Sequence, residues 1–251
     1  MNNLQEILRF PVRDAEARKQ FLFTCLISLA SFFIPILPLF LIMGYSVKVM
    51  RQVIDERQTP SMPDWQKVDW AETFVDGVKL YGLQLVLTLP LFVLLGCGMV
   101  SMFGGMASLS LLADESTRSF APLGGVFMFI GIAVMMFFSL LSLPYQVIIS
   151  AAAPHMVAKR SFAAGFEFKE WFAIFRKGLG PFLLAYALTF IVSFVFVLIM
   201  QVAFITLVLM CIVPFLMIPY SAYLMLMIHT LNAQAYLAGR DALQAEGFAQ
   251  A

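Results

Sequence analysis

The chain has 251 residues, of which 61% are hydrophobic and only 12% are charged, against about 25% charged in an average soluble domain. Its 16 basic and 15 acidic residues leave a net charge of +1. These numbers exclude an ordinary soluble globular protein. A chain with so little net charge, and without a basic run interleaved with aromatic residues, also gives no case for a nucleic-acid partner.

Four long stretches of the chain contain no Asp, Glu, Lys or Arg. They are 20–47, 80–113, 119–158 and 178–239, and each is longer than the ~20 apolar residues that a helix needs to cross the hydrocarbon core. We therefore expect an all-α fold, a polytopic membrane helix bundle with about six membrane segments. These segments would form three helical hairpins with interfacial amphipathic helices, in a single transmembrane domain over residues 1–251.

Residues 1–19 precede the first charge-free stretch. Apolar residues recur there every three to four positions among charged ones, a spacing that predicts an amphipathic helix at the membrane interface. Two roles fit such a helix: binding of anionic lipids, or simply positioning the first membrane segment. The segment that follows has no convincing small-residue cleavage site, so we expect it to be retained and not removed as a signal peptide.

The region 20–57 contains Pro35 and Pro38, which remove two backbone donors and predict a kink or turn. It either crosses the membrane once or forms a first hairpin. With a hairpin, 15 of the 16 Lys and Arg residues lie on one side; with a single crossing the division is 5 against 11. The positive-inside rule favours the hairpin, although its two legs, about 21 Å each, are shorter than the ~30 Å hydrocarbon core.

Four further regions complete the predicted architecture. Residues 64–79 and 165–178 are amphipathic segments that contain tryptophan, and we expect both to be interfacial helices. Residues 80–158 would form the second hairpin, with the polar loop 114–119 at its far end, and 179–238 the third.

Glycine is concentrated in the second hairpin, at 96–105 and 124–131. Small residues let helices approach closely in lipid, and they would equally suit the wall of a ligand path. We expect close helix packing at these positions.

A pattern of aromatic and small residues occurs twice along the chain. The stretch Gly44–Gly77 begins with Gly-Tyr and the stretch 144–178 begins with Pro-Tyr, and both end on Trp, Phe and Gly with spacings of four and three residues. A third Pro-Tyr pair stands at 219–220. The pattern predicts an internal repeat, in which a return leg leaves the membrane, crosses the interface and re-enters through a helix anchored by tryptophan.

The repeat marks seven residues as candidate cavity or lipid contacts. Its tyrosines could ring a central cavity and bind a headgroup or substrate, or each could donate to a backbone carbonyl that a nearby proline frees. Its basic residues suit snorkelling to the interface, and its tryptophans suit the interfacial aromatic belt. The candidates are Tyr45, Tyr145, Tyr220, Lys48, Arg51, Trp70 and Trp171.

Groups suited to catalysis or metal binding are scarce. Membrane enzymes and ion-coupled transporters usually need ionisable groups inside the membrane, but His155 and His229 are the main titratable candidates within the apolar runs. They could form a proton relay or a metal pair, or act as polar caps near the interface; no carboxylate lies in either run to orient them, which favours caps. The three cysteines form no CxxC pair. We expect no catalytic, cofactor-binding or metal-binding residue and no cofactor.

Three stretches of the sequence together resemble a known protein family. The residues Leu8–Pro11, the pair Gly44-Tyr45 with the basic residues that follow, and the stretch from Pro63 to Gly77 resemble the prokaryotic membrane family named "domain of unknown function 4013". The general pattern is also similar to the membrane domain attached to some glycerophosphodiester phosphodiesterases. The first resemblance implies a six-segment bacterial or archaeal membrane protein and brings no established activity or catalytic residues.

Two functions are compatible with this sequence. The first is a non-enzymatic integral membrane protein: a structural, assembly or lipid-interacting component, such as an accessory subunit of a membrane complex or a homo-oligomer, with membrane lipids as partners. The alternative is a transporter or channel for an uncharged or lipid-like substrate. In both cases we expect a multi-pass protein of the prokaryotic cytoplasmic (inner) membrane with both termini in the cytoplasm.

The predicted topology can be tested by single-cysteine labelling in intact cells, in a chain whose native Cys25, Cys97 and Cys211 are replaced. A membrane-impermeant maleimide should reach a cysteine at position 116, because the loop 114–119 is the only polar loop expected outside. It should not reach positions 5, 66 or 165. Labelling of position 5 from outside would contradict the hairpin over 20–57.

Overall fold

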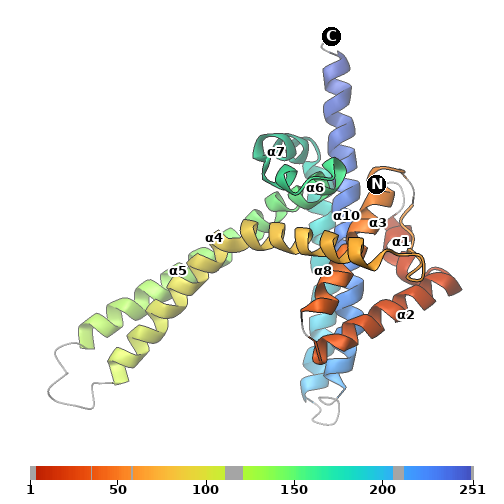
Figure 1. Ribbon diagram of the computed structural model, residues 1–251. Coiled ribbons are helices and arrows are strands. Elements are labelled where there is room, and N and C mark those ends of the chain that lie inside the picture. The colour runs from red at the N-terminus through yellow and green to blue at the C-terminus, as the bar shows by residue number, and fades with distance from the viewer. Residues whose placement is uncertain (1–3, 35, 58, 111–120, 206–211, 250–251) are drawn as a thin grey trace. The chain divides into compact units, whose positions relative to one another are not determined.

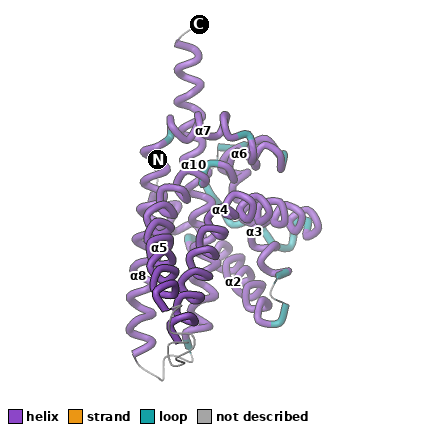
Figure 2. The backbone as a smooth tube through the Cα atoms, turned by 90° about the vertical axis from the view of Figure 1, so that its left-hand side faces the viewer, coloured by secondary structure: helices purple, strands orange, loops and turns teal. Residues whose placement is uncertain are grey.

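The computed structural model describes residues 4–34, 36–57, 59–110, 121–205 and 212–249. Every regular element in these ranges is a helix and none is a strand (Figures 1 and 2), which confirms the expected all-α fold. Five of these helical segments are long and apolar enough to cross a membrane. They are Leu37–Ile54, Trp70–Ser108, Leu123–Lys159, Leu179–Ile205 and Val213–Glu246.

The chain divides into two compact units. The first unit contains Met1–Leu83 and Ile149–Ala251, and the second contains Gln84–Ile148. The long helix α4 (Trp70–Ser110) begins in the first unit and continues through the second. Helix α5 (Ala121–Ile149) lies almost wholly in the second.

The N-terminal segment is not one continuous helix. It forms α1 (Leu4–Arg9), the 3₁₀ helix η1 (Phe10–Val12) and then α2 (Ala15–Leu29). The break has a local cause, because the Asp14 side chain accepts a hydrogen bond of 2.8 Å from the Ala17 N–H and thereby caps a new helix. The interfacial helix expected over 1–19 is therefore shared between α1 and the first turn of α2.

Helix α2 has a reversed distribution of polar and apolar side chains. Gln20, Thr24 and Ser28 lie buried on one face, and the hydroxyls of the latter two donate to carbonyls one turn back. The apolar Leu22 and Leu26 point outward, with exposed fractions of 67% and 59%. A water-soluble protein would place these faces the other way round, so the surroundings of α2 are apolar.

The described residues on either side of Pro35 show the expected break between two helices, and Pro35 itself lies outside the described residues. A 3₁₀ helix η2 (Ala30–Phe32) ends α2, and α3 (Leu37–Ile54) begins with Pro38 in its first turn, where a missing N–H costs nothing. The 15 residues of α2 amount to about 22 Å, less than the ~30 Å core. The first leg of the hairpin is thus as short as the sequence predicted, and the hairpin over 20–57 stays a prediction.

Helix α10 (Val213–Ala249) is the centre of the first unit (Figure 1). It packs against α3, α6 (Ala152–Lys159), α7 (Phe168–Lys177) and α8 (Leu179–Ile205), and its inner face is apolar. Two clusters of buried side chains join it to the N-terminal helices and α8. They contain Phe10, Tyr45, Val49, Trp65, Val68 and Leu226 in one case, and Ile7, Ala185, Met227 and Leu231 in the other.

The two expected interfacial helices begin later than the pattern 64–79 and 165–178 suggested. Helix α4 begins at Trp70, because the Asp69 carboxylate accepts a hydrogen bond of 3.1 Å from the Glu72 N–H. Residues 64–69 instead form a turn that buries Trp65. Helix α7 begins at Phe168, after the 3₁₀ helix η5 (Phe162–Phe166).

Helices α3 and α4 cross in backbone contact at Gly44 and Gly77. A Cβ atom on Gly44 would lie 1.7 Å from the Thr73 carbonyl oxygen, and one on Gly77 would lie 1.8 Å from that of Phe40. Only glycine permits so close an approach. Gly44 and Gly77, the first and last residues of the motif, therefore lie opposite each other at one helix crossing.

The second copy of the motif ends at a crossing of the same kind. A Cβ atom on Gly239 of α10 would lie 2.4 Å from the Ile174 oxygen, and one on Gly178 would lie 3.0 Å from the Ala235 oxygen. In both crossings each glycine faces the carbonyl four residues before its partner glycine.

The second unit is a pair of helices in close contact. A Cβ atom on Gly131 of α5 would lie 2.9 Å from the Gly98 oxygen of α4, and one on Gly105 would lie 2.7 Å from the Gly124 oxygen. These glycines thus serve the close packing expected of them. The loop expected at 114–119 lies outside the described residues.

The α3–α4 crossing can be tested by the substitution Gly44→Ala. The methyl group overlaps a backbone carbonyl that cannot rotate away, so we expect a loss of about 1–3 kcal/mol in the free energy of unfolding. Gly180→Ala is the matched control, because nothing lies within 4 Å of a Cβ atom there and alanine favours the helix by about 1 kcal/mol. Thermal unfolding in detergent should therefore shift in opposite directions, and a Gly44→Ala protein as stable as the natural one would contradict the crossing.

Candidate functional site

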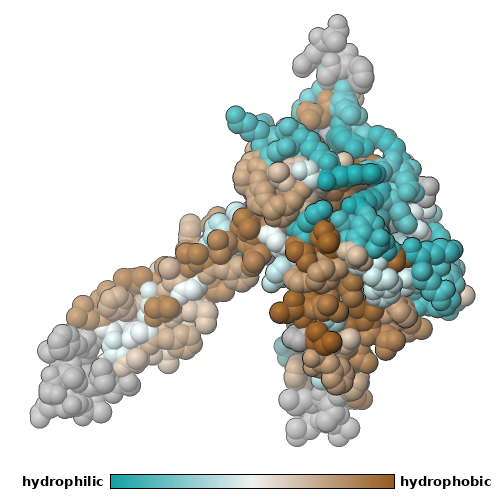
Figure 3. Space-filling view, viewed as in Figure 1, coloured by the Kyte–Doolittle hydropathy of each residue, from teal (hydrophilic) through white to brown (hydrophobic). Residues whose placement is uncertain are grey.

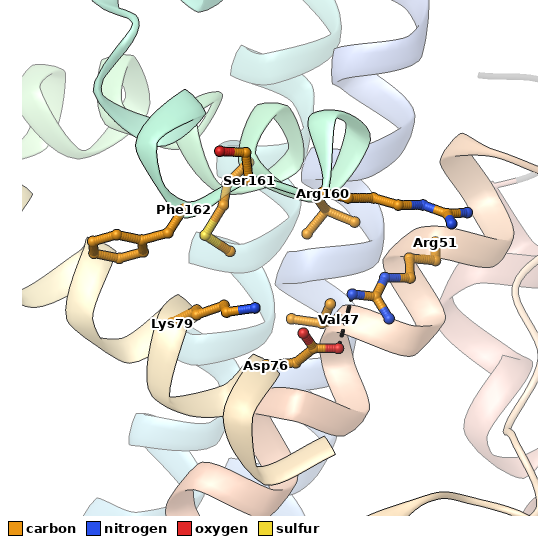
Figure 4. A pocket seen from close by; sticks show the side chains of 9 residues that line it. Val47, Arg51, Asp76, Lys79, Arg160, Ser161 and Phe162 are labelled. Atoms are coloured by element: carbon orange, nitrogen blue, oxygen red, sulfur yellow. Dashed lines mark ion pairs between the residues drawn. The ribbon is translucent and has the colours of Figure 1, made fainter. Parts of the chain in front are cut away.

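A small polar pocket lies among α3, the start of α4 and the end of α6 (Figure 4). Its volume is about 20 Å³, room for about one water molecule. It is therefore no substrate cavity, but a notch that can hold a single small polar group. It is lined by Val47, Arg51, Asp76, Lys79, Met156, Val157, Arg160, Ser161 and Phe162.

Arg51 is the central charge of the pocket. Its guanidinium lies 3.0 Å from Glu72 and 2.8 Å from Asp76, and Lys48 lies 2.9 Å from Glu72 on the other side. Asp76 is only 5% exposed, and its Oδ2 lies 2.8 Å from Nη2 of Arg51. Among the described residues, neither this Oδ2 nor the Nε of Arg51 has a hydrogen-bond partner. A buried oxygen in this state is available to a water molecule or a donor that enters the pocket.

Lys79 attracts Asp76 electrostatically but forms no close ion pair with the described residues of the pocket. Figure 4 shows its ammonium directed into the pocket, and it makes no hydrogen bond or ion pair with any side chain that the structure describes. In the sequence it is the last charged residue before the charge-free stretch 80–113. It therefore lies where a membrane helix meets the polar interface.

Arg160 takes part in the pocket through an unusual backbone. Its φ of 52° is left-handed, and the N–H groups of Arg160 and Ser161 bond back to Val157 and Met156 at 3.2 and 3.3 Å. This is the Schellman motif, whose left-handed position is normally occupied by glycine. A non-glycine residue in this conformation costs about 1–2 kcal/mol, so the arginine side chain is a candidate for function. It forms an ion pair of 3.0 Å with Asp55.

A second cluster gathers around His155. The histidine is 2% exposed; its Nδ1 lies 2.9 Å from the Tyr236 hydroxyl of α10, and its Nε2 lies 3.3 Å from Glu167 and 3.8 Å from Glu170. The ammonium of Lys159 lies 2.5 Å from both carboxylates. Hydrogen bonds from Lys159 and then His155 lower the pKa of Glu167 below its ordinary value, so its carboxylate is ionised near neutral pH.

His229 is separate from this cluster. It is buried in α10, and its Nδ1 lies 2.7 Å from the Met225 carbonyl oxygen one turn back. This contact gives the ring a local partner on its own helix. The structure thus gives the two histidines different surroundings.

Each of the three predicted tyrosines contacts a specific partner in the structure. The Tyr45 hydroxyl donates to the Pro63 carbonyl oxygen at 2.7 Å, and that of Tyr145 donates to the Leu87 carbonyl oxygen, one residue from the carbonyl that Pro90 leaves without a donor. The ring of Tyr220 stacks on Phe196, with centroids 3.5 Å apart. None of the three lines the pocket of Figure 4, and their role as cavity or lipid contacts stays a prediction.

The tryptophans differ from one another in burial. Trp70 is exposed, whereas Trp171 is buried and donates to the Gly165 carbonyl oxygen at 3.2 Å. Trp65 is the most connected: it stacks on Tyr45 with centroids 4.3 Å apart, and its indole N–H donates to the Thr24 hydroxyl at 3.0 Å.

Sequence reasoning placed Arg51 and Lys48 among the candidates, and they lie at or beside the pocket. It missed Lys79, Arg160, Glu167 and Glu170. The apolar run that contains His155 has no carboxylate. The two glutamates that lie beside the histidine come from beyond the next turn of the chain. The available signal was the alternation of Lys and Glu over 159–170, directly after the histidine's helix.

Among the comparisons with known proteins, the one with protein families gives a match. A family model described as "Protein of unknown function (DUF4013)" matches residues 27–205, which include Gly44–Gly77 and leave out Leu8–Pro11. Comparison with curated proteins and with solved structures gives no match. The likeness to the membrane domain of glycerophosphodiester phosphodiesterases stays a prediction. Because the match covers more than half of the chain, this protein, with its membrane-span-like helices, belongs to the DUF4013 family of proteins of unknown function.

Proposed function

We propose that this protein is a non-enzymatic integral membrane protein of the prokaryotic cytoplasmic membrane that binds anionic lipids at the polar side of its first unit. The observation that carries the proposal is the pocket of Figure 4, whose lining includes Lys79 and Arg160, each at the end of a charge-free stretch. A lipid-interacting component of this kind acts in the organisation or assembly of membrane proteins. The same surface would serve an accessory subunit of a larger complex.

The outer surface of the first unit supports a lipid environment. Helix α8 exposes large apolar side chains along most of its length, and α2 turns its leucines outward while it buries its polar residues. Figure 3 shows hydrophobic residues gathered over the lower part of this unit and hydrophilic ones over its upper part. Such a continuous apolar surface is costly in water and favourable in lipid.

The charges of the pocket lie at the boundary between these two parts. Lys79 precedes the charge-free stretch 80–113, and Arg160 follows the stretch 119–158 by two residues. Their heads therefore lie at the depth of lipid headgroups, where basic side chains interact with phosphates. Because Asp55 neutralises part of Arg160, the ammonium of Lys79, which forms no close ion pair with the described residues, is the principal attraction for a phosphate.

The size of the pocket determines what part of a lipid enters it. A volume of about 20 Å³ admits one oxygen atom and not a whole headgroup. A phosphate at the mouth could place one oxygen against Lys79. Acyl chains would lie along the apolar helices.

Lipid binding can be measured by native mass spectrometry of the full chain in a neutral detergent, with phosphatidylglycerol and phosphatidylcholine as probes. We expect the natural protein to retain phosphatidylglycerol preferentially. Each of the substitutions Lys79→Gln and Arg160→Gln should lower its apparent affinity about fivefold, the equivalent of ~1 kcal/mol per basic residue.

Lys169→Gln is the matched control, because Lys169 is exposed on α7 and does not line the pocket. It removes the same charge and should leave lipid binding nearly unchanged. Equal loss in the control would show general charge attraction in place of a site. Equal retention of the two lipids by the natural protein would overturn the proposal.

A further inference from the structure

The cluster around His155 has the composition of a metal site. Its potential ligand atoms are an imidazole nitrogen and two carboxylate oxygens, from His155, Glu167 and Glu170, and all lie within 4.8 Å of one another. His155 comes from α6, and the two glutamates come from the start of α7 and the residue before it. The segment 160–167 connects the two helices and brings these side chains together. One histidine with two carboxylates is a donor set typical of Zn²⁺ and similar divalent transition ions.

The distances fit a tetrahedral ion. Ligand atoms bound to Zn²⁺ at 2.0–2.1 Å lie about 3.3 Å apart. The Nε2 of His155 lies 3.3 Å from the Glu167 oxygen and 3.8 Å from the Glu170 oxygen. Small rotations of two exposed carboxylates would complete the geometry, with solvent in the fourth position.

The histidine is held in the orientation that a ligand needs. Its other nitrogen, Nδ1, lies 2.9 Å from the Tyr236 hydroxyl of α10, and the ring is buried against that tyrosine. Histidines that bind metals almost always use their second nitrogen in such a contact, which fixes the ring. The tyrosine hydroxyl can accept from Nδ1–H, which leaves Nε2 free to bind a metal.

Lys159 shows that the position between the carboxylates attracts a cation. Its ammonium lies 2.5 Å from both glutamates. It is the last residue of α6, and its flexible side chain is partly exposed, so it can move into solvent when another cation arrives. The natural site would therefore hold either the ammonium or a metal ion.

We propose that His155, Glu167 and Glu170 form a binding site for a divalent transition ion of the Zn²⁺ class, in which Lys159 is the competing internal cation. This site is independent of lipid binding at Lys79. A metal there would tie α6 to α7 and, through Tyr236, to α10.

The test uses the full chain without a histidine tag, purified in neutral detergent and stripped of metals with a chelator. Titration with Co²⁺, followed by its visible absorption, should show one tetrahedral site, and Zn²⁺ should displace Co²⁺ because it binds more tightly in the Irving–Williams order. Glu167→Gln and Glu170→Gln should each weaken binding at least about tenfold. Lys159→Gln should strengthen binding, because it removes the competing charge.

The matched control is Glu246→Gln. Glu246 pairs with Lys177 on the surface of the same unit, and its loss should leave Co²⁺ binding unchanged. All four substitutions are at partly exposed side chains, so the fold should persist, which thermal unfolding of each variant can verify. The proposal is overturned if the natural protein takes up no stoichiometric Co²⁺, if the two glutamate variants bind as well as the natural protein, or if Lys159→Gln brings no increase.

Discussion

The backbone contact between Gly44 and Gly77 determines where the charges of the first unit lie. Arg51 follows Gly44 by about two turns of α3, and Asp76 directly precedes Gly77 on α4, so the crossing brings the guanidinium within 2.8 Å of the carboxylate. Packed helices usually lie 8–10 Å apart, depending on the side chains between them; side chains at this crossing would move the two charges apart. The crossing at Gly178 and Gly239 acts in the same way for α7 and α10, which carry Glu170 and Tyr236.

A buried ion pair is costly in a membrane protein unless its position limits the loss of hydration. Arg51 and Asp76 meet this requirement, because Asp76 lies one turn before the charge-free stretch 80–113 and Arg51 still has a quarter of its side chain exposed. The second carboxylate, Glu72, faces solvent more openly and is shared by Lys48 and Arg51. The charges thus form a graded network from solvent to the first apolar turn, which is the arrangement that a headgroup would meet.

Much of the fold follows from the sequence, because lipid imposes simple rules on it. Charge-free stretches predicted the long helices, and the prolines at 35 and 38 predicted the break before α3. The true start of α4 escaped prediction because a single side chain, Asp69, decides it locally. The burial of Trp65 and the convergence of His155 with Glu167 depend on partners 41 and 12 residues away, and no local pattern specifies such contacts.

Consecutive residues of one turn serve the two candidate sites. Lys159 lies against Glu167 and Glu170, whereas Arg160 lines the pocket with Asp76 and pairs with Asp55. The left-handed backbone at Arg160 separates them, since a right-handed residue there would continue α6 and carry the following segment away from α3. An exposed ion pair such as Arg160–Asp55 contributes about 0–1 kcal/mol, which does not by itself offset the cost of about 1–2 kcal/mol for the conformation. The backbone hydrogen bonds of the Schellman motif must therefore supply the remainder, and they do so for glycine and arginine alike. What arginine adds over glycine at this position is its charge, placed where the membrane helix ends.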